Sequence, residues 1–422
     1  MFRTVLGHLK SARPKSLKVQ QQQQLSPLST SSNMKKTQTQ KFLDTFNLKY
    51  PIIQSPMAGA STVKLASSVT KLGGLGSIPL GAFSYSGSDV DKIRSQYQQY
   101  QSLLESQPTV SANTVNLNFF AHDPPHRDLQ VEQRWISKVK ELYGFDNLNS
   151  VQELKLIYPT FKSITDHNDP ILELLKQIDP QMISFHFGLP QLSIIKQLQS
   201  FGTKIFVSVT NLEEFKQALK CQVDGVILQG YEAGGHRGNF KQNDPQDEKL
   251  PVRQLTEQVT EYIKSESEAS PFIIAAGGFH DSKQIKDFIQ EFDIAGVQLG
   301  TVWLPSTDCT ISQRHLEHFI DPQTGVSTIM NPAISGRCLR TIESDFLNQL
   351  MSFDDAEIPD YPLPYDLFKK LRPAHLQALE HVEPDSLDSF KFSAFLAGSN
   401  YHLSYKGTRD TQEIFRQLTK HL

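Results

Sequence analysis

The stretch Gly225-Val-Ile-Leu-Gln-Gly-Tyr-Glu-Ala-Gly-Gly-His-Arg-Gly238 carries the pattern that decides the fold. A short apolar run is followed at once by a glycine-rich loop that contains a carboxylate and an imidazole. Apolar runs of this length are typical of strands buried on both faces of a parallel sheet. The stretch therefore predicts a buried strand that ends in a functional loop.

Similar apolar runs occur on both sides of this stretch, and helix-periodic segments separate them. Repeated β/α units predict a parallel sheet, and eight of them form an α/β TIM (β/α)8 barrel. The expected strands are Ile52–Met57, Leu75–Ile78, Val115–Phe120, Met182–Phe187, Lys204–Val209, Gly225–Gln229, Phe272–Ala276 and Ala295–Leu299. The expected helices include Thr62–Leu72, Val90–Leu104, Leu192–Phe201, Leu212–Lys220, Val252–Lys264 and Ser282–Glu291. A doubly wound open sheet is the alternative topology.

Residues 1–41 differ in composition from the rest of the chain. Asp44 is the first acidic residue, Gln20–Gln24 is a homopolymer, and serine and threonine crowd residues 26–32. Such a segment cannot bury a core, which predicts disorder. Its basic residues and helically spaced apolar residues also resemble a mitochondrial transit peptide. The alternative is an untargeted polar extension on a cytoplasmic protein.

The remaining residues, 42–422, are expected to form one barrel domain with two additions. The connection between the third and fourth strands is long, which predicts an inserted lid or subdomain at about 121–175. Residues 305–422 follow the eighth strand and are mostly helical in pattern. We expect them to supply the closing helices of the barrel and a helical C-terminal extension.

Composition excludes several classes of protein. The net charge of −3 shows no basic excess for binding a nucleic-acid backbone. Cys221, Cys309 and Cys338 are too far apart for a zinc or disulfide pattern, and no apolar run approaches the roughly 18 residues that span a bilayer. We expect no nucleic acid, membrane or metal partner, and the oligomeric state stays open.

The candidate site follows from the barrel, because active sites of this fold lie at the carboxyl ends of the strands. Gly277-Gly278 and Gly300-Thr301 follow the last two expected strands. Barrels frequently bind phosphate at these two positions through backbone amides, and glycine allows a close approach. These turns predict a ligand that carries a phosphate, although ordinary strand-to-helix turns would look the same.

Two histidines stand at expected strand ends. His236 closes the glycine-rich loop, which can lie beneath a planar cofactor, and an imidazole with a pKa of about 6.5 suits proton transfer. A surface-loop histidine is the plainer interpretation of His236 alone. His186 alternates with Phe185 and Phe187, so it points either into the barrel mouth or against the helices.

Six segments resemble the nitronate monooxygenase family, formerly called 2-nitropropane dioxygenases, in matching order. The resemblance covers about residues 48–400. The segments are Tyr50-Pro-Ile-Ile-Gln-Ser-Pro-Met-Ala-Gly59, Ser184-Phe-His-Phe-Gly188, Gln229-Gly-Tyr-Glu-Ala-Gly-Gly-His-Arg-Gly238, Ala275-Ala-Gly-Gly278, Gly296-Val-Gln-Leu-Gly-Thr301 and Ser335-Gly-Arg-Cys-Leu-Arg340.

The resemblance implies bound FMN, with His236 as the catalytic histidine and His186 in the substrate pocket. Asn116 and Asn118 compete for one amide position, and Asn118 is chosen because it precedes two phenylalanines, as in the family. The implied FMN-binding residues are Pro56, Met57, Ala58, Asn118, Gln229, Gly234, Gly235, Gly277, Gly278, Gln298, Leu299, Gly300 and Thr301.

The reaction implied by the resemblance is oxidation of an alkyl nitronate, such as propionate 3-nitronate, by molecular oxygen. The products are a carbonyl compound and nitrite, which would make the protein a detoxification enzyme. Because a fold does not fix a function, other activities stay open. They are an NAD(P)H-dependent flavin reductase acting on quinones or enoyl thioesters, a non-catalytic ligand-binding barrel and a barrel aldolase without flavin.

Overall fold

Eight parallel strands form the centre of the fold, in the order β1-β9-β8-β6-β5-β4-β3-β2. The computed structural model describes residues 36–85, 87–105, 110–143, 159–266, 271–320, 327–378, 394–404 and 406–422. The barrel strands are β1 (Ile52–Gln54), β2 (Ser77–Pro79), β3 (Asn116–Phe120), β4 (Met182–His186), β5 (Lys204–Val209), β6 (Gly225–Gln229), β8 (Phe272–Ala276) and β9 (Gly296–Leu299).

The two ends of this sheet meet, so the barrel is closed. Leu75, just before β2, accepts a backbone hydrogen bond from Gln54 at 2.9 Å and donates one to Ile52 at 2.9 Å. Ile53 and Leu75 form a parallel bridge. The predicted TIM barrel is confirmed, and the open doubly wound sheet is wrong.

Strand positions agree closely with the prediction, and β5, β6 and β8 agree at both ends. The expected first strand continued to Met57, but β1 ends at Gln54. Pro56 has no amide hydrogen to donate to a ladder, so the chain leaves the sheet there. The seventh and eighth expected strands are β8 and β9, because the short β7 (Gly235–His236) lies outside the barrel.

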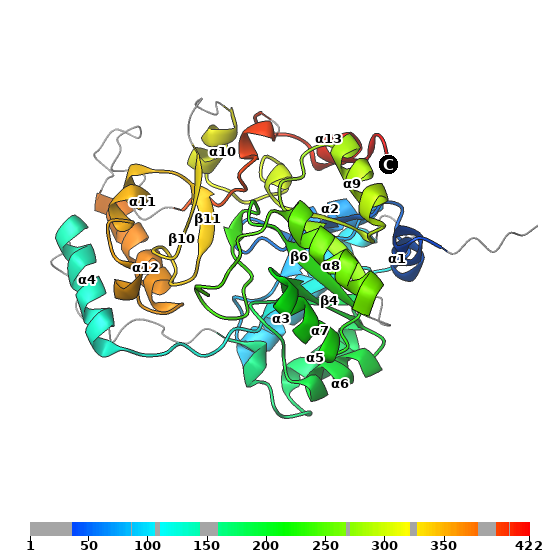
Figure 1. Ribbon diagram of the computed structural model, residues 1–422, viewed down its shortest axis with the longest axis horizontal. Coiled ribbons are helices and arrows are strands. Elements are labelled where there is room, and N and C mark those ends of the chain that lie inside the picture. The colour runs from blue at the N-terminus through cyan, green and yellow to red at the C-terminus, as the bar shows by residue number, and fades with distance from the viewer. Residues whose placement is uncertain are drawn as a thin grey trace, which may run out of the picture. The chain divides into compact units, whose positions relative to one another are not determined.

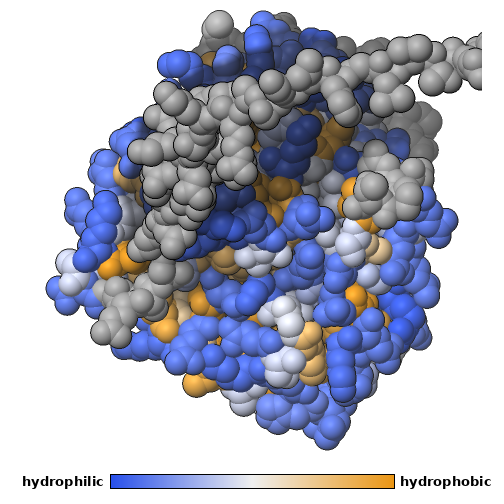
Figure 2. Space-filling view, turned by 90° about the vertical axis from the view of Figure 1, so that its right-hand side faces the viewer, coloured by the Kyte–Doolittle hydropathy of each residue, from blue (hydrophilic) through white to orange (hydrophobic). Residues whose placement is uncertain are grey.

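Helices cover the outside of the barrel, and their capping residues explain where they begin. Thr62 caps α2 through the amide of Leu65, and Asn211 and Asp281 cap α7 and α9 in the same way. Figure 2 shows a mostly hydrophilic outer face with small separate hydrophobic patches. These helices are α2 (Val63–Lys71), α3 (Ser88–Leu104), α5 (Pro170–Ile178), α6 (Leu192–Ser200), α7 (Leu212–Lys220), α8 (Val252–Glu266), α9 (Ser282–Phe292) and α13 (Thr411–Thr419).

Helix α1 (Gln38–Phe46) closes the amino ends of the strands. The side chains of Gln38 and Thr39 donate hydrogen bonds to the carbonyls of Pro271, just before β8, and Ile294, two residues before β9. Phe42 and Phe46 are fully buried against aromatic residues of the barrel interior. The segment predicted to be disordered through residue 41 is therefore helical from Gln38, and residues 1–35 lie outside the described residues.

A second hydrophobic cluster joins the inserted segment to the C-terminal region. Trp135 on α4 (Leu129–Tyr143) is fully buried with residues of α11 (Asp345–Leu350) and α12 (Leu363–Ala378). Figure 1 shows these three helices grouped together, away from the barrel helices α5 and α6. Residues 144–158 of the predicted insertion are not among the described residues.

The C-terminal region is not only helical, and the prediction was incomplete there. Strands β10 (Thr328–Asn331) and β11 (Leu339–Ile342) form an antiparallel sheet with β7. Helix α10 (Gln313–Ile320) precedes this sheet, and α13 returns to pack against α2 and α9 of the barrel. Among the described residues, no helix is long and apolar enough to cross a membrane.

Candidate functional site

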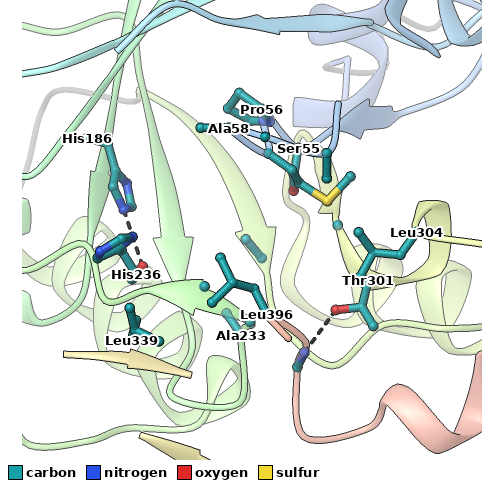
Figure 3. Close-up of a pocket in the computed structure, with 18 of the residues that line it drawn as sticks. Ser55, Pro56, Ala58, His186, Ala233, His236, Thr301, Leu304, Leu339 and Leu396 are labelled. Atoms are coloured by element: carbon teal, nitrogen blue, oxygen red, sulfur yellow. Dashed lines mark hydrogen bonds between the residues drawn. The ribbon is translucent and has the colours of Figure 1, made fainter. Parts of the chain in front are cut away.

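A cavity of about 500 Å3 lies at the carboxyl ends of the barrel strands. Figure 3 shows His186 and His236 on one side of it and Ser55, Pro56 and Thr301 on the other. All fifteen residues named from the sequence line this cavity. They are Pro56, Met57, Ala58, Asn118, His186, Gln229, Gly234, Gly235, His236, Gly277, Gly278, Gln298, Leu299, Gly300 and Thr301.

The two candidate asparagines differ in their depth in the barrel. Asn118 lines the cavity, and its amide donates to the hydroxyl and carbonyl of Ser184. The side chain of Asn116 is fully buried and donates to Ser77 at 3.0 Å. Residues two apart on a strand point the same way, so the amides lie at different depths of the barrel, and Asn118 is nearer the mouth.

The backbone of His236 is held from two sides. Its carbonyl oxygen accepts hydrogen bonds from His186 Nε2 at 3.3 Å and from Gln229 Nε2 at 2.9 Å. The other end of the Gln229 amide accepts from the backbone of Gly238 at 2.7 Å. Gln229, expected to bind the cofactor, therefore also fixes the loop that presents His236.

A buried ion pair supports this loop from below. Arg237 makes a two-pronged contact with Asp247, at 2.9 and 2.7 Å, and donates to the carbonyl of Gln229 at 2.7 Å. The arginine side chain is only 1% exposed. Bidentate pairs of this kind fix geometry as well as charge, so the loop has little freedom to move.

Both histidines are neutral at physiological pH. Burial, with smaller contributions from the neighbouring His186, Arg337 and Lys369, lowers the pKa of His236 to about 3. Burial likewise lowers the pKa of His186 to about 4. A neutral imidazole has one nitrogen with a free lone pair and one N–H group, so each ring can accept one hydrogen bond and donate another.

Positive charge surrounds this half of the cavity. Arg337 is 3% exposed and forms no ion pair with a described carboxylate, although Asp123, Glu214 and Asp360 lie near enough to act on its charge. Its guanidinium stacks 4.3 Å from the centre of the Phe187 ring, and Lys369 lines the cavity itself. No cavity-lining residue among the described ones is acidic. The site therefore favours a ligand that is negatively charged.

Backbone conformations at the cavity are unusual. Phe187 has φ +73°, a left-handed conformation that costs roughly 1–2 kcal/mol for a residue with a side chain. Gly277 and Gly278, after β8, have φ +125° and +76°. A Cβ at Gly234 would lie 2.5 Å from the backbone of Ala397, so glycine is required there. Such strain is concentrated at functional sites.

The structure adds residues that the sequence did not single out. Tyr361, Tyr365 and Lys369, from α12 and the turn before it, line the cavity, together with Phe395 and Asn400. Local pattern could not find them because they reach the barrel mouth only through tertiary packing. Ser335, which contacts His236 Nε2 at 2.9 Å, belongs to a segment quoted for the resemblance but was given no role.

The described residues contain no group of three or more histidine, cysteine or acidic side chains arranged to hold a metal. The predicted chemistry does not depend on one. The cavity instead combines glycine turns, amide side chains and neutral imidazoles, which suit an organic cofactor and a small substrate.

Comparisons with known proteins identify the family of this chain. A relative from Saccharomyces cerevisiae is 33% identical over 353 residues, which cover 79% of this chain and 84% of that protein. The nitronate monooxygenase of Pseudomonas aeruginosa is 30% identical over 344 residues, covering 81% of this chain and 91% of its own. The crystal structure of nitroalkane oxidase from Streptomyces ansochromogenes superimposes with a TM-score of 0.70 at 24% identity, covering 90% and 97% of the two chains.

That structural likeness, at this identity, supports the fold. The assignment of the family comes from the sequence comparisons, because the model of the nitronate monooxygenase family matches residues 39–388. This match includes every strand of the barrel as well as His186 and His236. The chain is an oxidoreductase and belongs to the nitronate monooxygenase family.

Proposed function

We propose that this protein uses FMN to oxidise small alkyl nitronates with molecular oxygen, giving a carbonyl compound and nitrite. The observation that carries the proposal is the charge of the cavity. It holds neutral histidines and Lys369, has Arg337 behind it and contains no acidic lining residue among those described. A nitronate is an anion, and this environment stabilises an anion rather than a cation.

The family is flavin-dependent, and the cavity has features that fit a flavin. Gln298 Oε1 is buried at the cavity wall without a hydrogen-bond partner, and a buried acceptor of this kind is costly unless a ligand donates to it. Gly277 and Gly278 carry no side chain, so a ligand can approach the backbone directly after β8. These residues, with Gly300 and Thr301 after β9, would hold the phosphate and ring of FMN.

Bound FMN would supply the electron acceptor for the nitronate, and oxygen would receive the electrons afterwards. The protein's own residues bind, orient and exclude water. His236 would take a proton from a neutral nitroalkane or hold an oxygen of the preformed nitronate. His186, Lys369 and Tyr361 line the same half of the cavity and would orient the nitro group.

We also propose that the helical cluster of α4, α11 and α12 covers the cavity. The segment from Tyr361 to Lys369 belongs both to this cluster and to the cavity wall. Movement of the cluster would therefore change access to the site. Lys138 of α4 pairs with Glu357 just before this segment, which ties the insertion to the cover.

One experiment tests the cofactor and the substrate on the same sample. The purified protein is denatured and its released cofactor identified by chromatography, and oxygen consumption is then measured with ethyl nitronate and propionate 3-nitronate. We expect FMN and nitronate-dependent oxygen uptake with stoichiometric nitrite. Recovery of FAD or of no flavin after reconstitution, or absence of oxygen uptake, would reject the proposal.

The alternative is an NAD(P)H-dependent flavin reductase. Anaerobic oxidation of NADH or NADPH with a quinone or an enoyl thioester as acceptor separates the two functions. A nicotinamide-dependent rate well above the nitronate rate would favour the reductase. The fold alone does not decide between the two functions, because one fold can host many reactions. A second protein, FabK from Thermotoga maritima, also superimposes on this chain, with a TM-score of 0.60 at 18% identity.

A further inference from the structure

We infer that Ser335 is the residue that selects the tautomer of His236 and thereby makes Nδ1 of that imidazole the proton acceptor at the cavity. The inference rests on the proposed function for its kinetic consequence, but its structural part follows from the hydrogen bonds of Ser335 and the burial of His236 and needs no activity. It concerns a residue that is fully buried and does not itself line the cavity.

The hydroxyl of Ser335 takes part in three contacts. It donates to the carbonyl of Arg337 at 2.8 Å, it accepts from the backbone amide of Arg337 at 3.2 Å, and it lies 2.9 Å from His236 Nε2. A hydroxyl has a single hydrogen. Two oxygen atoms this close need a hydrogen between them, and the carbonyl oxygen of Arg337 carries none. The hydroxyl hydrogen of Ser335 therefore points to Arg337.

The contact with His236 must then run in the other direction. With its hydrogen engaged, the Ser335 oxygen can only accept, so His236 Nε2 carries the proton and donates it. Because the imidazole is neutral, Nδ1 carries the free lone pair. Among the described residues, Nδ1 of His236 has no hydrogen-bond partner. Nδ1 is also not fully buried, so it faces the cavity.

The turn that holds Ser335 is itself rigid. The backbone amides of Ser335 and Gly336 both donate to the carbonyl of Pro332, at 3.1 and 2.7 Å. Gly336 has φ +87°, and a Cβ there would lie 2.3 Å from the amide of Tyr361. The serine hydroxyl is therefore fixed between the cavity wall and β11, where it can hold the ring of His236.

The other contacts of His236 fix its backbone and confine its ring, but the hydrogen bond to Ser335 sets which nitrogen of the ring faces the cavity. The backbone of His236 is fixed by pairing with Leu339 of β11 and by two hydrogen bonds to its carbonyl. Its ring stands edge-on to Phe187, Tyr361 and Tyr365, at centroid separations of 5.6, 6.0 and 6.2 Å. These aromatic contacts confine the ring to a slot, but they do not distinguish its two nitrogens.

The chemical step that depends on this arrangement is deprotonation of a neutral nitroalkane. The proton on the carbon next to the nitro group moves to Nδ1, the C–H electron pair stays on the substrate, and a nitronate anion and an imidazolium form. Nε2 keeps its proton and its hydrogen bond to Ser335 throughout. If the opposite tautomer were present, Nδ1 would carry a hydrogen and could not accept this proton.

The test begins with the wild-type tautomer, which needs no activity. The protein is labelled with 15N-histidine, and long-range proton–nitrogen correlation spectra are recorded at pH 7.5, with the His236→Asn variant used to assign the signals. We expect a neutral ring protonated at Nε2. A ring of His236 protonated at Nδ1 would overturn the inference, whatever substrate the enzyme uses.

The second arm measures rates in Ser335→Ala, Ser335→Thr and the control Ser77→Ala. Ser77 is another fully buried serine, whose hydroxyl accepts from Asn116 at 3.0 Å and does not contact His236. At equal flavin content, Ser335→Ala should lose roughly 10- to 100-fold on a neutral nitroalkane and little on its preformed nitronate. Ser335→Thr, which keeps the hydroxyl, should recover most of the loss.

Each outcome decides the matter. A wild-type Nε2–H signal that becomes mixed in Ser335→Ala, with loss confined to the neutral substrate, supports the inference. Equal losses on both substrates, or an unchanged tautomer and rate, overturn it. If no variant or wild type consumes oxygen with any nitronate, the proposed function fails, while the spectra still decide the role of Ser335.

Discussion

The two ends of the barrel differ in how they use the same strands. At the amino end, α1 inserts Phe42 and Phe46 against Phe206 and Phe272, and the interior is packed aromatic side chains. At the carboxyl end, the same strands open on a cavity of about 500 Å3. One end buries hydrocarbon, whereas the other buries neutral imidazoles and an unpartnered amide oxygen.

This difference shows how the fold separates stability from chemistry. Packed aromatic side chains contribute free energy of folding, while buried polar groups and left-handed backbone cost free energy and are kept for binding. The arrangement agrees with the general division of TIM barrels into a stabilising face and an active face. Substitutions at the amino end should therefore lower stability and leave activity unchanged, whereas substitutions at the carboxyl end should mainly lower activity.

The largest effect is expected from His236→Asn at the carboxyl end. Loss of a general base should lower kcat/KM on a neutral nitroalkane by about 10²–10⁴-fold, because His236 is the group proposed to take the proton. A preformed nitronate has already lost that proton and should suffer much less. The measurement is the ratio of the two losses, at equal flavin content.

The matched control for that variant is His167→Asn, at an exposed histidine that contacts Gln197. It should leave both rates unchanged. Equal losses on both substrates in His236→Asn would instead assign His236 a binding or electrostatic role. Full activity on both substrates would exclude His236 from the chemistry and direct attention to His186.

At the amino end, Phe46→Ala should act on stability alone. Removing a fully buried phenylalanine typically costs about 3–5 kcal/mol in the free energy of unfolding. The folded fraction should keep its flavin and its kcat, because Phe46 lies at the opposite end of the strands. Urea unfolding followed by circular dichroism gives the first quantity, and a loss of kcat in fully folded protein would contradict the division.

Buried histidines should make stability depend on pH, and His236, His186 and His315, which line the cavity, have pKa values lowered to about 3 or 4. His236 and His186 have a pKa of about 3 and about 4 when folded, below the ordinary value of 6.5. Above pH 6.5 they are neutral in both states and stability is complete. Below pH 6.5 each of these histidines is protonated in the unfolded chain but neutral in the folded protein. Each therefore lowers the free energy of unfolding by about 1.4 kcal/mol per pH unit until the pH reaches its folded pKa.

Unfolding free energies measured at pH 7, 6 and 5 check this dependence. His236→Asn should reduce the slope by one proton, whereas Phe46→Ala should lower the curve without changing its slope. An identical slope in wild type and His236→Asn would show that the buried imidazole does not account for it. The carboxyl end would then affect how the unfolding free energy depends on pH, and the amino end would affect its overall size.

The smallest effect is expected from removal of residues 1–35. Their composition lacks acidic residues and predicts no contribution to a core, so flavin content, rates and unfolding should not change. Removal of residues 1–46 also deletes α1 and should destabilise the amino end strongly. Differential scanning calorimetry of both truncations tells them apart, and a large loss from the shorter one would contradict the prediction.

How much could be predicted from sequence differs between the parts of the site. The strand ends were predictable, because buried strands and their glycine-rich loops are local patterns and the barrel places all carboxyl ends together. His186, His236, Asn118 and Gly277 therefore line one cavity, as expected. Helix α1 was not predicted, because its first residues share the polar composition of the segment before them.

The sequence by itself determined the barrel, the family and the set of residues at the strand ends, because these depend on short-range periodicity and on ordered motifs. Only the tertiary structure decided that β11 pairs with β7 and brings Ser335 to His236, that Arg337 is buried without an ion pair among the described residues, and that Lys369 reaches the cavity. Protonation and charge depend on burial and on neighbours distant in sequence, which no local pattern records.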